Sequence, residues 1–127
     1  MAFGRLTTAS LIKPLEGAII RRGQLGATVL AGEIVFLQSD GKWDPAVLTA
    51  ATLTARIAVQ GGVDGDEVDM VTYGPVLCIE EGTIGALVYG SDTAGEPSLT
   101  AGTKSTIVGY CETAAILFVQ PQIVSLT

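Results

Sequence analysis

The sequence contains no histidine, only two cysteines, and few charged or aromatic residues. The absence of histidine excludes Ser-His-Asp and Cys-His nucleophile systems, histidine general bases and histidine-containing zinc sites. Charged residues make up 16% of the chain, against about 25% in an average domain. Apolar residues make up 48% and aromatic residues 6%, so the apolar content is mainly aliphatic. We expect a chain with so little charge to hide part of its surface in an assembly.

Two stretches resemble catalytic or metal-binding motifs, but neither meets the chemical requirements. In "GSDTAG" (90–95), Ser91 and Asp92 have no base beside them, and the spacing is not that of a nucleophile elbow. "GGVDGDEVD" (61–69) resembles one calcium-binding nonapeptide with Asp64 in place of a glycine, yet such repeats bind calcium by stacking. The sequence therefore predicts a surface hairpin at the first stretch and a tight turn at the second. No catalytic residue, metal site or cofactor is predicted.

The cysteines, the charge and the hydropathy exclude further classes of function. Cys78 and Cys111 are too few for a secreted disulfide framework and are expected to be reduced thiols buried on strands. A disulfide between them is possible if their strands pair. The net charge of −6 argues against binding to nucleic acid. No uncharged run reaches the ~18 apolar residues of a membrane-spanning helix, so no membrane partner is expected.

Charge is distributed unevenly along the chain. Residues 1–22 hold four positive charges and one negative charge, a balance of +3. Residues 23–127 hold three positive and twelve negative charges, a balance of −9. The difference predicts an N-terminal arm over 1–22 and a β domain over 23–127. A docking arm and a solvated tail are both compatible with this pattern.

Short β-like runs separated by glycine-rich turns dominate the rest of the sequence. Asp40-Gly41 is a hairpin signal between two of these runs. The segment 44–56 could begin a helix at Pro45, but its threonines favour extended structure in its second half. Strands are predicted over 17–22, 33–38, 55–60, 67–73, 75–80, 86–90, 105–111 and 114–120.

This pattern predicts an all-β fold, a small β-barrel or β-sandwich (tulip-like) of about seven or eight short strands with an extended N-terminal arm. The run "AAILFVQ" (114–120) is apolar nearly throughout and does not alternate. A strand of this kind is covered on both faces. We expect the core on one side and a neighbouring subunit on the other.

Four motifs follow one another along the chain: "VLAGEIVFLQSDGKWDPA" (29–46), "ARIAVQGGVDGDEV" (55–68), "GTIGALVYGSDTAG" (82–95) and "IVGYCETAAILFVQP" (107–121). In this order they resemble the tailed-phage capsid cement, or head decoration, proteins. The shared features are a strand entry before an S-D-G-x-W turn, a V-Y strand with an A-G loop, and a closing strand pair. The match spans about residues 23–121, and its motifs are structural.

The resemblance implies a structural virion protein, made in the host cytoplasm, on the outer surface of an icosahedral capsid. Its partners would be the major capsid protein, whose subunits it bridges, and itself, as a homotrimer or a dimer. Deletion of residues 1–22 would then abolish shell binding and leave the body folded. The capsid-docking candidates are Phe3, Arg5, Leu11, Ile12, Lys13, Arg21 and Arg22. The subunit-interface candidates are Ile116, Leu117, Phe118 and Val119.

Two other functions are compatible with the sequence. A small β adaptor of a phage tail or baseplate would be present in a few copies, whereas a cement protein would be present in hundreds. A carbohydrate- or ligand-binding β module would use Trp43, Tyr73 and Tyr89 as a stacking surface. Trp43 is also placed to seal one end of a barrel. An enzyme is the least favoured class, because general acid–base groups are scarce.

Overall fold

The computed structural model describes residues 3–38, 40–45, 55–90, 94–100 and 107–122. In this part of the chain the fold is all-β, with a single turn of 3-10 helix, Ala9–Leu11. The strands are β1 Gly4–Arg5, β2 Lys13–Pro14, β3 Ile19–Gln24, β4 Ile34–Leu37, β5 Trp43–Asp44, β6 Ala55–Ala58, β7 Glu67–Leu77, β8 Ile79–Glu80, β9 Leu87–Gly90, β10 Pro97–Ser98, β11 Ile107–Cys111 and β12 Ile116–Gln122.

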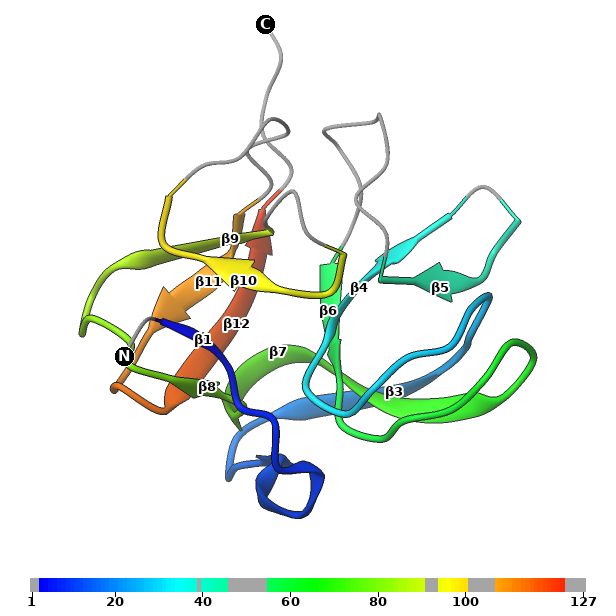
Figure 1. The fold of residues 1–127 in the computed structure, drawn as a ribbon, viewed down its shortest axis with the longest axis horizontal. Helices are drawn as coiled ribbons and strands as arrows, with labels where there is room; N and C mark the ends of the chain where they lie inside the picture. Colours follow the sequence, from blue (N-terminus) through cyan, green and yellow to red (C-terminus); the bar gives the residue numbers. More distant parts are fainter. Residues whose placement is uncertain (1–2, 39, 46–54, 91–93, 101–106, 123–127) are drawn as a thin grey trace, which may run out of the picture.

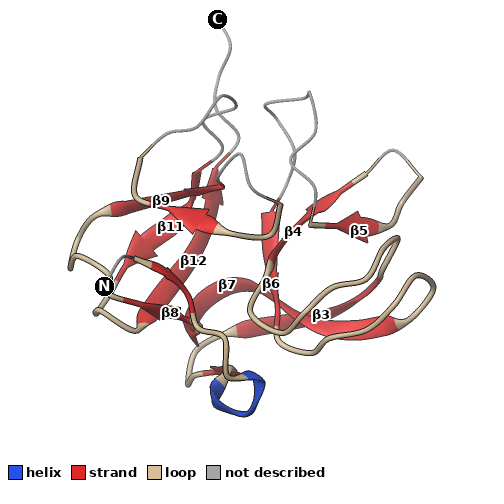
Figure 2. Cartoon of the chain, viewed as in Figure 1, coloured by secondary structure: helices blue, strands red, loops and turns tan. Residues whose placement is uncertain are grey.

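The strands form one curled antiparallel sheet, a half-barrel, and a small two-stranded ribbon (Figures 1 and 2). The order in the large sheet is β10-β9-β11-β12-β7-β6-β4-β5, and β2 and β3 also pair with β7. β1 pairs with β8 in the ribbon. The predicted fold class is confirmed, and each of the eight predicted strand regions overlaps a strand of the structure.

Two apolar clusters lie on opposite faces of the sheet around β4, β6 and β7. On β4, Ile34 and Phe36 point into the larger cluster, while Val35 between them points into the smaller one. β7 divides in the same way, with Val71 in the larger cluster and Met70 in the smaller one. Since successive side chains of a strand point to opposite faces, these strands are covered on both sides. The continuous apolar sequence of β4 is explained by that position.

β7 crosses both halves of the sheet as one strand where the sequence predicts two. Gly74 lies inside this strand with a φ of +110°, a conformation that suits glycine. A Cβ on Gly74 would lie 2.7 Å from the Cα of Ala18, so the backbones also approach too closely for a side chain. Pro75 follows inside the strand, opposite Phe118 of β12. The strand therefore continues through this glycine and proline, where the sequence predicts a break.

The sequence assigns residues 1–22 to an extended arm, but three strands within residues 4–24 are hydrogen-bonded to strands of the β domain. β1, β2 and β3 pair with β8, β7 and β7 respectively. Ile12 is buried in the larger cluster, and Phe3 packs against that cluster. The expected boundary at residue 22 falls inside β3. The physical reason is that this segment contributes apolar side chains to the core, which its charge balance does not reveal.

The predicted turns are formed where the structure describes them. At Asp40-Gly41 the Lys42 amide donates to the Asp40 carboxylate at 2.9 Å, and β4 pairs with β5 across this turn. In the stretch 61–69, residues 61–66 form the turn before β7, where the Val63 amide donates to the Asp66 carboxylate at 2.9 Å, and residues 67–69 begin the strand. The predictions for 46–54, and those for Ser91 and Asp92, lie outside the described residues.

Candidate interaction surfaces

The first candidate surface is the open edge of β3. This strand pairs along its length with β7, and no other described strand pairs with its second edge. Exposed side chains occupy most of its positions. Ile19 and Ile20 are 55% and 44% exposed, which is unusual for isoleucines on a strand at a sheet edge. An edge of this kind offers unpaired backbone groups and apolar side chains to a partner strand.

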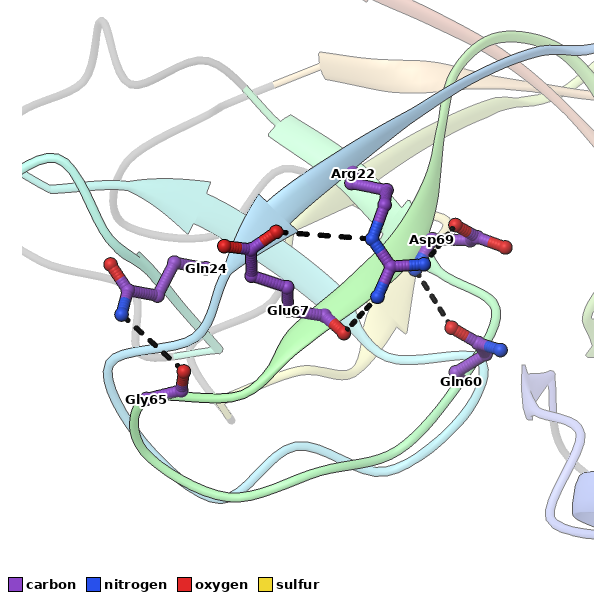
Figure 3. A network of polar contacts seen from close by, with 6 residues as sticks. All are labelled: Arg22, Gln24, Gln60, Gly65, Glu67 and Asp69. Carbon is purple, nitrogen blue, oxygen red and sulfur yellow. Dashed lines mark hydrogen bonds and ion pairs between the residues drawn. The ribbon is translucent and has the colours of Figure 1, made fainter.

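Arg22 on β3 is tied to the neighbouring strand, as Figure 3 shows. Its guanidinium donates to the Glu67 carbonyl at 2.7 Å and to the Asp69 carboxylate at 3.2 Å. Its Nε lies 3.9 Å from the Glu67 carboxylate. The Asp69 amide in turn donates to the Gln60 side chain at 2.9 Å. These exposed pairs each add little to stability, but they neutralise the Arg22 charge on the strand.

The seven docking candidates divide into interior and exposed residues. The Arg5 side chain is only 12% exposed and forms an ion pair with Glu96 at 3.0 Å, which fastens β1 beside β10. Phe3 and Ile12 pack in or against the larger cluster. The structure therefore leaves exposed only Leu11, Lys13, Arg21 and Arg22.

The second candidate surface is the outer face of the sheet over β9, β11, β12 and the second half of β7. The strand residues 73–77, 87–90, 107–111 and 116–122 contain no charged side chain. Half-buried and exposed apolar side chains line up across the strands through the pairs Ile19–Tyr73, Pro75–Phe118, Phe118–Tyr110 and Tyr110–Leu87. We call this the outer face, formed by Ile19, Tyr73, Leu87, Tyr110, Ile116 and Phe118.

The Phe118 ring at the centre of the outer face contacts two tyrosine rings. Phe118 stacks on Tyr110 with ring centroids 5.2 Å apart and meets Tyr73 edge-on at the same distance. Phe118 and Ile116 lie on this face, whereas Leu117 is fully buried in the larger cluster. Val119, the fourth interface candidate, is buried there too. β12 thus supplies alternate residues to the core and to the outer face.

Trp43 and Arg56 form a contact that the sequence does not reveal. Trp43 is buried in the smaller cluster, and the Arg56 guanidinium lies 4.2 Å from the centre of its ring. The expected stacking surface of Trp43, Tyr73 and Tyr89 is therefore not formed as predicted, because the Trp43 ring is covered. The two contacting residues are thirteen positions apart on different strands, and no local pattern in the sequence links them.

Among the described residues there is no pocket and no group of three or more potential metal ligands. No described helix has the length and hydropathy to cross a membrane. Cys78 and Cys111 are both buried and unpaired in the larger cluster. Burial raises the pKa of the Cys78 thiol, and the nearby Cys111 raises it further. Both sulfur atoms therefore serve as packing groups here.

No protein-family model matches this chain, and no curated protein shows a significant match to it. The resemblance to capsid cement proteins therefore rests on the four sequence motifs. The two surfaces described above are the structural features from which a function can be argued.

Proposed function

We propose that this chain is a structural virion protein that binds the outer surface of an icosahedral phage capsid and cements it by bridging major capsid subunits. The observation that carries the proposal is the open edge of β3, with exposed isoleucines beside unpaired backbone groups. A strand of the shell protein added to this edge would supply the docking contact. Several such contacts on one rigid lattice would give high avidity even if each is weak.

Shell binding by an edge variant tests this proposal. Ile20→Lys places a charge on the exposed edge, where lysine opposes the addition of another strand. We expect it to weaken binding to emptied, expanded shells of the encoding phage by about tenfold or more, since a desolvated charge costs over 1 kcal/mol. Co-sedimentation of purified protein with the shells measures the affinity.

The matched control is Ile84→Lys, which adds the same charge at an isoleucine that is 74% exposed, in the turn before β9. Both variants should remain folded, because substitutions of exposed residues usually change stability by within about 0.5 kcal/mol. Equal binding by the two variants would remove the β3 edge from the docking mechanism.

The outer face supports self-association as the second half of the proposed mechanism. A chain with net charge −6 repels other copies of itself, and the outer face brings two copies together without placing like charges opposite each other. Protein interfaces are depleted of charge and enriched in tyrosine and phenylalanine at their centres. A copy held over β9, β11 and β12 at this face would leave the β3 residues beyond Ile19 available for the shell.

The oligomeric mass in solution tests the role of the outer face. We expect a mass that is a small multiple of 13.0 kDa, and we expect Leu87→Glu to shift it towards a single chain. Leu87 is 44% exposed and lies opposite Tyr110 on this face. The control is Leu30→Glu, at a leucine that is 54% exposed in the loop before β4. Light scattering that finds a monomer for the unmodified chain would contradict this assignment.

A further inference from the structure

Three basic residues form no ion pair with any carboxylate in the described part of the chain. Arg5, Arg22 and Lys42 each form an ion pair with a carboxylate. Of the thirteen acidic residues, only Asp92 lies outside the described part, so nearly all possible partners are accounted for. The basic residues that form no ion pair with a described carboxylate are Lys13, Arg21 and Arg56.

Two of these residues, Arg21 and Arg56, lie on one face of the sheet beside the open edge of β3. Arg21 lies directly opposite Met70 of β7, so the two side chains share a face. Arg56 reaches over the same residue from β6, with its Nη1 4.0 Å from the Met70 sulfur. The Arg56 guanidinium also stacks on Trp43 at 4.2 Å, which fixes its position. Both cations therefore face the same patch of surface.

This arrangement is unfavourable without an anion. Burial lowers the pKa of Arg56, and the positive charge of Arg21 lowers it further, so the two guanidiniums are close enough to repel each other. Arg56 is also partly buried, and a desolvated charge without a counter-ion is costly. A carboxylate placed between them would remove the repulsion and accept charge-assisted hydrogen bonds from both.

We propose that Arg21 and Arg56 form a carboxylate site that recognises an acidic side chain on an extended partner segment added to β3. This inference rests on the proposed function, in which such a segment belongs to the shell protein. In a strand added beside β3, alternate side chains point to the face that carries Arg21, Met70 and Trp43. A Glu or Asp at the position opposite Arg21 falls on that site. The net charge of −6 disfavours a nucleic-acid phosphate as the occupant.

A pair of synthetic peptides tests this site directly. The probe is a capped peptide of alternating valine and glutamate, matched in length to the six residues of β3, and its control has glutamine in place of glutamate. Trp43 is the only tryptophan in the chain and lies beneath Arg56, so its fluorescence reports on the site. We expect the glutamate peptide to bind at least about tenfold more tightly than the glutamine peptide. The preference should weaken as salt is added.

Variants that each remove one positive charge distinguish a specific carboxylate site from non-specific electrostatic attraction of the peptide to the protein. Arg56→Gln and Arg21→Gln should each abolish the preference for the glutamate peptide. Lys13→Gln removes the same charge from an exposed unpaired residue on β2 and should leave the preference intact. If Arg56→Gln loses packing on Trp43 and unfolds, the exposed Arg21→Gln variant still decides the question.

The proposal is overturned if the glutamate peptide does not bind at millimolar concentration, if the two peptides bind equally, or if Lys13→Gln weakens the preference as much as Arg21→Gln. Failure of the site and failure of the proposed function remain distinguishable. A chain that binds shells but shows no peptide preference lacks the carboxylate site only. A chain that prefers the glutamate peptide but does not bind shells keeps the site and loses the proposed function.

Discussion

A chain that lacks residues 1–22 is expected not to fold. The deletion removes β1, β2 and four of the six residues of β3, and it takes Ile12 out of the larger cluster. It also breaks the Arg5–Glu96 ion pair and leaves one edge of β7 uncovered. Loss of the buried isoleucine alone costs about 2–5 kcal/mol. That is a large part of the free energy of unfolding, which is about 5–15 kcal/mol for a native protein.

Circular dichroism and a thermal melt of the 23–127 fragment measure this effect.

A pair of single substitutions tests whether the buried isoleucine of this segment contributes to the loss of stability. Ile12→Ala should lower the free energy of unfolding by about 2–5 kcal/mol, while Leu11→Ala, at the exposed neighbouring residue, should change it by within about 0.5 kcal/mol. A cooperative melt of the fragment, near that of the full chain, would show that the segment is an independent arm after all.

The substitution Gly109→Ala is expected to destabilise the protein by about 3 kcal/mol, the upper end of the usual range for overpacking. Gly109 lies in β11 at a register shift, and a Cβ there would collide with the Phe118 carbonyl oxygen of β12. The same Cβ would lie 3.0 Å from the Gln120 amide nitrogen. Because both obstacles are backbone atoms, β11 and β12 would have to separate, and the core beneath them would open.

Urea denaturation measures the change, and Gly4→Ala is the matched control. No heavy atom lies within 4 Å of a Cβ built on Gly4, which is also in a strand. The control should therefore change the free energy of unfolding by within about 0.5 kcal/mol. Similar midpoints for the two variants would contradict the close approach of β11 and β12.

The strands that sequence reasoning finds are those long enough to show a pattern. β4, β7 and β12 carry apolar runs or alternation, and each lies within or overlaps its predicted region. β1, β2, β5 and β10 have two residues each, which is too short for any periodicity to be visible. Their positions are set by partners far away in the sequence. The continuity of β7 through Gly74 and Pro75 also depends on such partners, β12 and β2.

The candidate surfaces are only partly predictable for the same reason. The apolar run 114–120 correctly predicts a strand with the core on one side, and the structure assigns Leu117 to the core and Phe118 to the outer face. Its cover by a neighbouring subunit on the other side stays a prediction. The positive charge balance of residues 1–22 makes Arg21 a docking candidate, but it gives no indication that Arg56, on a different strand, lies near Arg21. Their proximity requires β3, β7 and β6 to lie side by side, which is a property of the sheet and not of any local sequence.

The number of copies of this chain in purified, DNA-filled particles tests the central claim most directly. Quantitative mass spectrometry against the major shell protein gives the ratio. The proposed cement function predicts about one copy per shell subunit, or a simple symmetry fraction of it, because each lattice position offers equivalent docking contacts. A few copies per particle would contradict it in favour of a tail or baseplate adaptor. Complete absence from the particle would contradict both virion functions.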